Sequence, residues 1–292
     1  MPPHPIELLE QVESWQWPPA TGQVLVAIFK TDQNQDMRCR AALMLGDLAI
    51  FNEQIGQALL AAVRDADQPV DVRAAAAVAL GPALEQTELV GFDDLEFDPP
   101  PLPEELFEQI QETFHDLSLD PTQPALLRRR TLEASVRAPE AWHRESVEKA
   151  WKTNDSEWQI TAVFCMGYLP GFEDKVLEAL KSPYQMVVNE AVFTAAERGM
   201  PEVFERLATM ARDGQLSDEQ RFTAIGGLGA MATQESVAVL NELSTSTHEE
   251  IARAAKEALM DAQVVAELDG VEEEWPEEDD FEPERGTAGA DN

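Results

Sequence analysis

The sequence predicts an all-α protein, an α-α superhelix of about six to seven stacked helical hairpins. Two observations lead to this fold class. The pattern in "DVRAAAAVALG", Asp71 to Gly81, recurs along the chain at a period of about 30 to 35 residues, as it does in solenoids. Strand patterns, in which apolar and polar residues alternate, are nearly absent.

The recurring pattern is D-V-R-x-x-A-x-x-x-L-G. Residues 36–46, "DMRCRAALMLG", match it at nearly every fixed position, whereas the copies that end at Gly167 and Gly229 keep fewer of them. The arginine position falls at Arg38, Arg73, Arg128, Gln159, Val188, Arg221 and Ala252. The steps between these positions are 35, 55, 31, 29, 33 and 31 residues, so one period continues with a single insertion.

Each copy of the pattern is expected to form the second helix of a hairpin. The first helices are expected in the apolar segments upstream, "VLVAIF", "IGQALLAAV", "VEKAW", "VLEAL", "VFERLATM" and "VAVLNEL". Side chains that could cap the start of a second helix are Asp36, Asp71, Ser156 and Asp218. Glycines at the expected helix ends, suited to a left-handed cap, are Gly46, Gly81 and Gly167.

These residues resemble the HEAT-repeat family, in particular the short bacterial HEAT-like repeats first recognised in phycobilisome lyases. The resemblance covers roughly residues 24–264. It implies that the second helices line the inner face, and that the Asp and Arg flanking the valine form a ladder between adjacent repeats. The positions that match this ladder are Asp36, Arg38, Asp71, Arg73 and Arg221. Gln159, Val188 and Ala252 depart from it, so the ladder is expected to be broken in the C-terminal half.

An acidic, proline-rich loop insertion is predicted at about residues 85–102, within a solenoid domain of residues 1–264. Between Ala74 and Leu127 there is no lysine or arginine, and the three prolines of residues 99–101 exclude a helix there. The following "PEELFEQIQETF" is amphipathic and is expected to be the first helix of the third repeat. The loop either docks on its own solenoid or contacts a partner, through Phe92, Asp93, Asp94 and Phe97.

The C-terminal residues 265–292 are predicted to be an acidic, disordered tail. Their composition combines many carboxylates with few apolar residues, so mutual repulsion opposes folding. Trp275 and Phe281 stand alone among the acids. Two interpretations stay open: a solvating tail, or a short linear motif whose two aromatic residues insert into a partner while the acids steer the encounter.

Charge restricts the classes of partner. The chain has 56 acidic and 21 basic residues, a formal net charge of −35, which repels nucleic acid and anionic membranes and favours a protein partner with a basic surface. No secretion signal and no apolar run of membrane-spanning length is present, so we expect a cytoplasmic, monomeric protein. Cys39 and Cys165 lie in helical patterns and are expected to be packing residues rather than a disulfide.

No local pattern indicates catalysis, a metal or a cofactor. The four histidines have no ligand-like spacing, and "GGLG" at Gly226 to Gly229 lacks the context of a phosphate loop. "RRR" at residues 128–130 is expected to pair internally with the acidic insertion, although an anionic partner site stays open. Trp15 and Trp17 are expected to cap the open apolar end of the first repeat.

The sequence therefore favours a noncatalytic scaffold or adaptor that binds another protein through the solenoid face, the acidic loop or the tail. One alternative is a nucleic-acid mimic, whose carboxylates would occupy a DNA- or RNA-binding protein. The other is a lyase or chaperone-like protein related to the phycobilin lyases, on the strength of the repeat alone.

Overall fold

The computed structural model describes residues 3–92 and 99–269, and every regular element in these ranges is helical. The chain forms two compact units, Met1–Ala195 and Ala196–Asn292, which are described separately. Within the predicted insertion, Phe92 is the last residue described before residues 93–98, which lie outside the described ranges. The predicted tail residues beyond Asp269 lie outside the described residues.

Unit 1 begins with the short helix α1 (Pro5–Leu9) and a 3₁₀ helix, η1 (Ser14–Gln16). Five hairpins follow: α2 (Thr21–Thr31) with α3 (Gln35–Leu45), α4 (Glu53–Arg64) with α5 (Val70–Val90), α6 (Glu104–Leu119) with α7 (Ala125–Ser135), α8 (Ala141–Trp151) with α9 (Ser156–Met166), and α10 (Glu173–Ala179) with α11 (Gln185–Glu197). Unit 2 holds η2 (Pro201–Val203), α12 (Phe204–Arg212), α13 (Asp218–Met231), α14 (Gln234–Leu243) and α15 (Glu249–Asp269). The described residues thus form seven hairpins, which confirms the predicted fold class.

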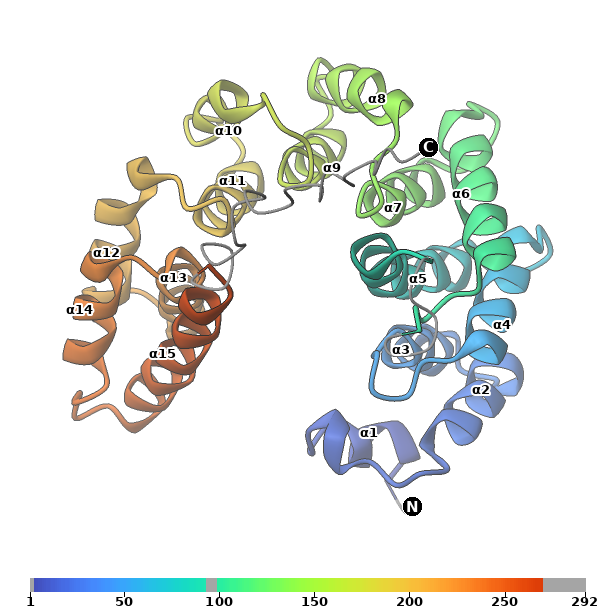
Figure 1. The fold of residues 1–292 in the computed structure, drawn as a ribbon, viewed down its shortest axis with the longest axis horizontal. Helices are drawn as coiled ribbons and strands as arrows, with labels where there is room; N and C mark the ends of the chain where they lie inside the picture. The colour runs from blue at the N-terminus through green and yellow to red at the C-terminus, as the bar shows by residue number, and fades with distance from the viewer. Residues whose placement is uncertain (1–2, 93–98, 270–292) are drawn as a thin grey trace, which may run out of the picture. The chain divides into compact units, whose positions relative to one another are not determined.

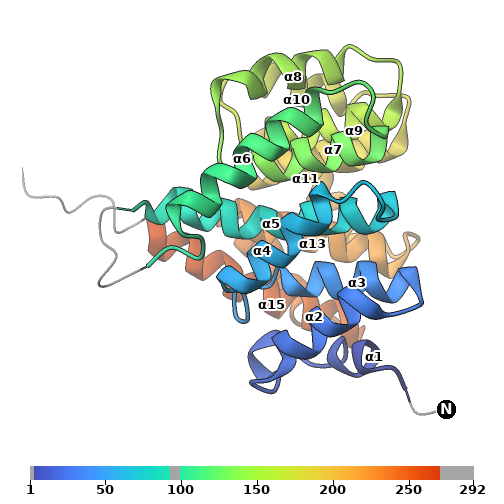
Figure 2. The same ribbon diagram turned by 90° about the vertical axis from the view of Figure 1, so that its right-hand side faces the viewer.

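Unit 1 is built in two layers (Figures 1 and 2). The first helices α2, α4 and α6 lie side by side in one layer, and the second helices α3, α5, α7 and α9 pack in succession in the other. This arrangement follows from the sequence, because each helix is apolar along one stripe and must bury that stripe against the neighbouring layer.

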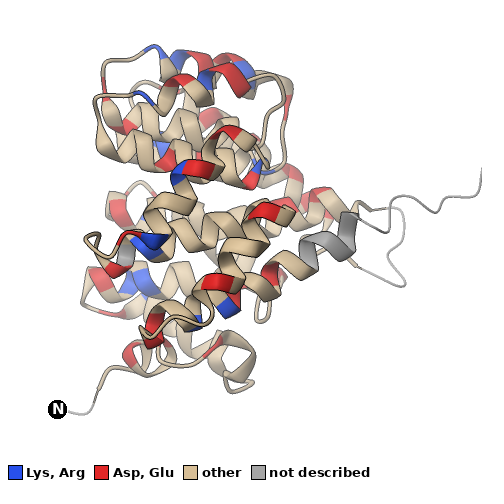
Figure 3. Ribbon diagram, turned by 90° about the vertical axis from the view of Figure 1, so that its left-hand side faces the viewer, with Lys and Arg blue, Asp and Glu red and all other residues tan. Residues whose placement is uncertain are grey.

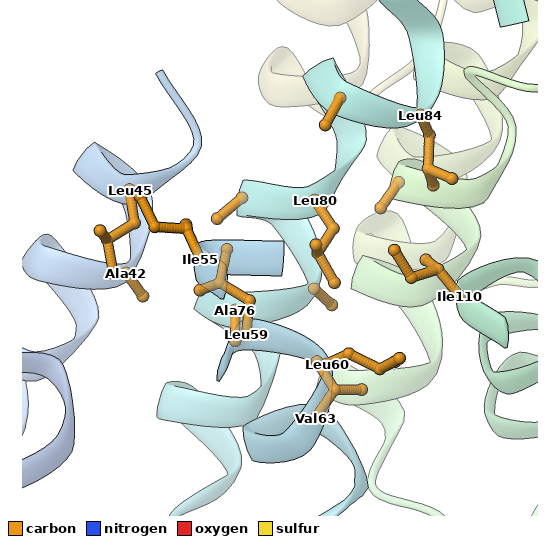
Figure 4. Packing of buried hydrophobic residues seen from close by; sticks show 14 of the residues in the cluster. Ala42, Leu45, Ile55, Leu59, Leu60, Val63, Ala76, Leu80, Leu84 and Ile110 are labelled. Carbon is orange, nitrogen blue, oxygen red and sulfur yellow. The ribbon is translucent and has the colours of Figure 1, made fainter. Parts of the chain in front are cut away.

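The core lies between the layers, and large aliphatic residues from both layers pack there against small residues of the second helices (Figure 4). Leu59 of α4 and Leu80 of α5 are fully buried, as is Ile110 of α6. Ala42 and Ala76, also fully buried, face them from the second helices, where a larger side chain would hold the helices apart.

The repeated glycines allow neighbouring second helices to approach closely, and the left-handed caps predicted for them are wrong. Gly46 and Gly167 have right-handed backbone conformations, and Gly81 lies inside α5. A Cβ on Gly46 would lie 2.6 Å from the carbonyl oxygen of Ala79, in the next repeat. Unit 2 repeats this contact, because a Cβ on Gly229 would lie 2.9 Å from the carbonyl oxygen of Ala258.

Helix α5 is longer than predicted and shortens the loop. It continues through Gly81 and Pro82 to Val90, so residues 85–90, expected in the loop, are helical. Leu84 and Thr87 are fully buried in this extension, and their burial holds the added turns against the core. The helix ends at Gly91, whose φ of 72° disfavours any other residue. Beyond the gap, α6 buries the predicted apolar stripe, and it is the first helix of the third repeat as expected.

The predicted caps lie one or two positions too far along the chain. Asn34 caps α3 by accepting from the Asp36 N–H, and Asp155 caps α9 by accepting from the Glu157 N–H. Ser217 caps α13 in a reciprocal capping box with Gln220. The acidic residues singled out in α3 and α13 occupy the first turn, where their charge favours the positive end of the helix dipole.

Two glycines of α13 provide a matched test of close helix packing. We expect Gly229→Ala to lower the free energy of unfolding of unit 2 by about 1–3 kcal/mol, because its new methyl group collides with backbone of α15. Nothing lies within 4 Å of a Cβ on Gly226, so Gly226→Ala should raise stability by about 0.5–1 kcal/mol through helix propensity. Urea unfolding followed by circular dichroism measures both, and equal effects would contradict the packing role.

Candidate protein-interaction surface

The residues predicted to contact a partner through the loop are only partly described. Phe92 is half-buried and packs edge-to-face on Phe107 of α6, with ring centroids 5.7 Å apart. This end of the loop is thus docked on its own solenoid. Asp93, Asp94 and Phe97, like Trp275 and Phe281 of the tail, lie outside the described residues.

The repeated arginine closes the hairpin that contains it. Its Nε donates a hydrogen bond to a backbone carbonyl in the last turn of the preceding first helix, which has no partner within that helix. Arg38 bonds to Phe29 O at 2.8 Å, and Arg73 bonds to Val63 O at 2.9 Å. The remaining equivalents are Arg128 to Ser118 O at 3.1 Å and Arg221 to Ala211 O at 3.1 Å. Each arginine also places its charge at the negative end of the helix dipole.

The contacts between repeats at this level differ from the expected Asp–Arg ladder. Asp71 accepts a hydrogen bond from Gln35 Nε2 at 2.7 Å, and Arg38 Nη2 donates to Gln68 Oε1 at 2.5 Å. Asp36 lies 3.7 Å from Arg40 on its own helix. The repeats are thus joined here through glutamine amides, one of which accepts from Arg38 while the Nε of that arginine bonds to the carbonyl of its own hairpin.

The three consecutive arginines fan out around α7 and pair inside unit 1, with partners other than the predicted acidic insertion. Arg128 also lies over the ring of Trp158, 5.2 Å from its centroid. Arg129 forms an ion pair with Glu157 at 3.0 Å, and Arg130 pairs with Glu133. These acids belong to the same and the following repeat, which the 31-residue period places within reach.

One set of side chains occupies equivalent positions on the second helices of unit 1. Its members stand five residues after the arginine position of their repeats; we call this set the second-helix face: Leu43, Val78, Glu133, Phe164 and Phe193. Leu43 is 49% exposed and Phe193 is 42% exposed, although both belong to buried residue types. Phe164 and Val78 are half-buried. Four of the five positions are therefore apolar, and the two most exposed of them lie on α3 and α11.

A shallow pocket of 170 Å³ opens within this face, between α5, α7, α9 and α11. Arg137, just after α7, borders it and forms an ion pair with Glu85 of α5. The same guanidinium lies over two aromatic rings, 5.5 Å from the centroid of Phe164 and 5.3 Å from that of Tyr168. An arginine held by a carboxylate and two rings is preorganised, so it loses little conformational entropy if it joins an interface.

Glu133 supplies a carboxylate at the centre of the face. Its side chain is almost buried, accepts a hydrogen bond from Thr161 Oγ1 at 2.5 Å, and pairs with Arg130. This carboxylate also contributes to raising the pKa of Cys165, although burial is the main cause. Cys165 is thus a neutral packing residue, and it and Cys39 are free thiols, as predicted.

Sequence reasoning missed this face. The signal was present as a constant offset from the repeated arginine, but the five residue types differ, and only the stacked helices reveal that they share one side. Among the described residues, no group of three or more His, Cys, Asp or Glu side chains is arranged to hold a metal ion. No described helix has both the length and the apolar character needed to cross a bilayer.

Comparison with known proteins agrees with this architecture. A family model described as HEAT repeats matches residues 173–260. This segment is therefore similar to HEAT repeats. The resemblance predicted from the arginine and glycine pattern is thereby confirmed there.

Among solved structures, the complex of CpcE and CpcF of phycocyanin lyase from Nostoc sp. PCC7120 matches with a TM-score of 0.54 and 15% sequence identity, over 90% of this chain and 98% of that chain. Human deoxyhypusine hydroxylase in complex with glycerol matches with a TM-score of 0.38 and 15% identity, over 85% and 86% of the two chains. At these identities the Nostoc match supports the fold alone. No curated protein sequence matches the chain.

The arginine-to-carbonyl bond can be tested at Arg73, which is buried. We expect Arg73→Met to lower the free energy of unfolding by roughly 2 kcal/mol, because the methionine keeps the apolar stem but leaves Val63 O without its donor. Arg253→Met, at a side chain 63% exposed, is the control and should change stability by less than about 0.5 kcal/mol. Urea denaturation of both variants measures the difference; similar losses would show that the carbonyl bond is not the cause.

His143 predicts an acid-sensitive stability. Its ring is fully buried and stacks on Trp142, Nδ1 accepts the Glu140 N–H at 2.8 Å, and Nε2 lies 2.9 Å from Ser135 Oγ. Burial lowers its pKa from 6.5 to about 4, so the folded protein binds fewer protons here than the unfolded chain. The stability contribution of the neutral ring is complete above pH 6.5, and about 3 kcal/mol of it is lost as the pH falls to 4.

Urea titrations at pH values between 7 and 4 measure this loss. In His143→Gln the decline attributable to this residue should disappear, whereas His248→Gln, which removes an exposed imidazole, should keep it. Parallel pH profiles for the wild type and His143→Gln would contradict the assignment.

Proposed function

We propose that this protein is a noncatalytic scaffold that binds a partner protein with a basic surface across the second-helix face of unit 1. The observation that carries the proposal is the apolar character of four equivalent positions on the second helices, of which Leu43 on α3 and Phe193 on α11 are exposed. Aromatic groups and a preorganised arginine, such as Arg137 over the half-buried Phe164, are the residue types that contribute most to protein interfaces.

The charge of the chain favours a basic partner. Acidic residues exceed basic ones by 35, and Figure 3 shows acidic and basic residues interspersed along the helices rather than gathered in one band. The net negative charge steers a cationic protein toward the surface and speeds association, while the apolar groups of the face supply most of the affinity. A nucleic-acid mimic would need carboxylates in rows like those of phosphates, whereas the acids here are interspersed with basic residues. We therefore prefer scaffolding to nucleic-acid mimicry.

The HEAT architecture supports a role in protein binding. The Nostoc relative was solved as a complex of two chains, CpcE and CpcF, which fits the use of this fold as an interaction surface. The loop and tail residues Asp93, Asp94, Phe97, Trp275 and Phe281 belong to the same proposal as an additional acidic and aromatic contact. Phe92 belongs to it with the part of its ring that Phe107 leaves exposed.

The test compares a double variant of the face with a variant of the opposite layer. Leu43→Ser with Phe193→Ser removes two exposed apolar groups, whereas Leu119→Ser removes one of similar exposure, 43%, at the end of the first helix α6. Affinity purification from native lysate with mass spectrometry identifies the partner, and titration of the purified partner gives its affinity for each variant.

We expect the face variant to weaken binding by about tenfold or more, and Leu119→Ser to leave it unchanged. Affinity should also fall when the salt is raised to about 0.3 M, because a basic partner is steered by charge. Unchanged binding by the face variant would overturn the placement of the site, and salt-independent binding would overturn the basic partner. Truncation after Asp269 measures the contribution of the tail separately.

A further inference from the structure

A second surface, on the opposite layer of unit 1, has the composition of a peptide groove. It is a cavity of 610 Å³ beside α2, between η1 with its following prolines and the segment that joins α3 to α4. Gly22 and Val26 lie on its α2 side, and Ile50 and Ile55 on the other. Its volume is within the range of known ligand sites, about 300–1,000 Å³.

The groove exposes a tryptophan that the core does not use. Trp15 is 75% exposed, so the sequence-based prediction that it caps the first repeat is wrong. Ile6 of α1, fully buried, covers that end of the core instead. Trp17 packs against the core. Its indole is fixed by Nε1, which donates to Leu9 O at 3.1 Å and to Val12 O at 3.2 Å. The indole of Trp15 is therefore available to a ligand, beside Pro18 and Pro19.

The electrostatic character of the groove is opposite to that of the chain. No Asp or Glu lines it, and its charged lining residue is Lys30, at the C-terminal end of α2. Lys30 is exposed and forms no ion pair with any described residue. An anionic segment can therefore pair with Lys30 here, although the chain as a whole carries 56 acids.

The dimensions suit an extended peptide. The part of α2 that lines the groove runs from Gly22 to Lys30 and is about 12 Å long. This length matches about four residues of polyproline II at 3.1 Å each. Proline rings pack flat against an exposed indole. The exposed side chains of Gln23 and Gln54 line the same groove, and their amide groups can donate to the free carbonyls of such a peptide.

We propose that this groove binds an extended, proline-containing segment of a partner protein, with the prolines on Trp15 and a carboxylate on Lys30. The site is separate from the second-helix face. Failure of either proposal therefore leaves the other standing.

The experiment titrates the full chain with fluorescein-labelled peptides and follows fluorescence polarisation. The probe is Ac-APPPPEA, with Ac-APPPPQA and Ac-AGGGGEA as matched peptides that lack the carboxylate or the prolines. We expect Ac-APPPPEA to bind at least about fivefold more tightly than either. Trp15→Ala should weaken it at least about fivefold, whereas Tyr184→Ala, at an aromatic residue 43% exposed elsewhere in unit 1, should not.

Lys30→Gln distinguishes charge recognition from general binding. It should abolish the preference for Ac-APPPPEA over Ac-APPPPQA while leaving the affinity for Ac-APPPPQA unchanged. Equal binding of Ac-AGGGGEA, or no effect of Trp15→Ala, would overturn the proline site. A concentration-dependent dimer of the full chain that Trp15→Ala dissolves would likewise overturn it, since a second copy would then be the occupant.

Discussion

The fold depends on how closely neighbouring second helices can approach one another. At Gly46 the space that a methyl group would fill is occupied by the carbonyl of Ala79, and the same relation recurs between Gly229 and Ala258. This contact sets the spacing of the second-helix layer, while the larger aliphatic residues of the first helices set the spacing of the other. The arginine-to-carbonyl bond then fixes each hairpin internally, so stacking and hairpin closure use different residues of the same short pattern.

The repeat made the fold predictable, because a pattern found in seven places averages out the weakness of each copy. The local roles were harder to predict. A glycine at a helix end fits a left-handed cap and close packing equally well, and only the distance to the next repeat decides between them. Similarly, Arg73 beside Asp71 has the spacing of an ion-pair ladder, yet the guanidinium reaches the carbonyl of Val63 in its own hairpin.

The candidate surfaces could not be predicted for a related reason. Phe193 and Leu43 look like core residues in the sequence, and their exposure follows from the rotation of their helices within the stack. Trp15 is also of a residue type that is expected in the core, but Ile6 of α1 covers the apolar end of the first repeat and leaves Trp15 exposed. Two segments of the N-terminal region have apolar residues that could cover this end of the core, and the sequence alone does not show which of them packs there.

The length of α5 has a consequence for how this chain can vary. Its 21 residues compare with 11 in α3 and in α7, and the added turns carry Glu85, paired with Arg137, and Thr87, whose hydroxyl accepts from the Leu102 N–H. A hairpin of ordinary length can be duplicated or excised with its neighbours finding equivalent contacts. In unit 1, by contrast, the added turns of α5 tie its hairpin to the following repeat through Glu85 and to the segment before α6 through Thr87, so removing the α4–α5 hairpin would leave both partners without their contacts.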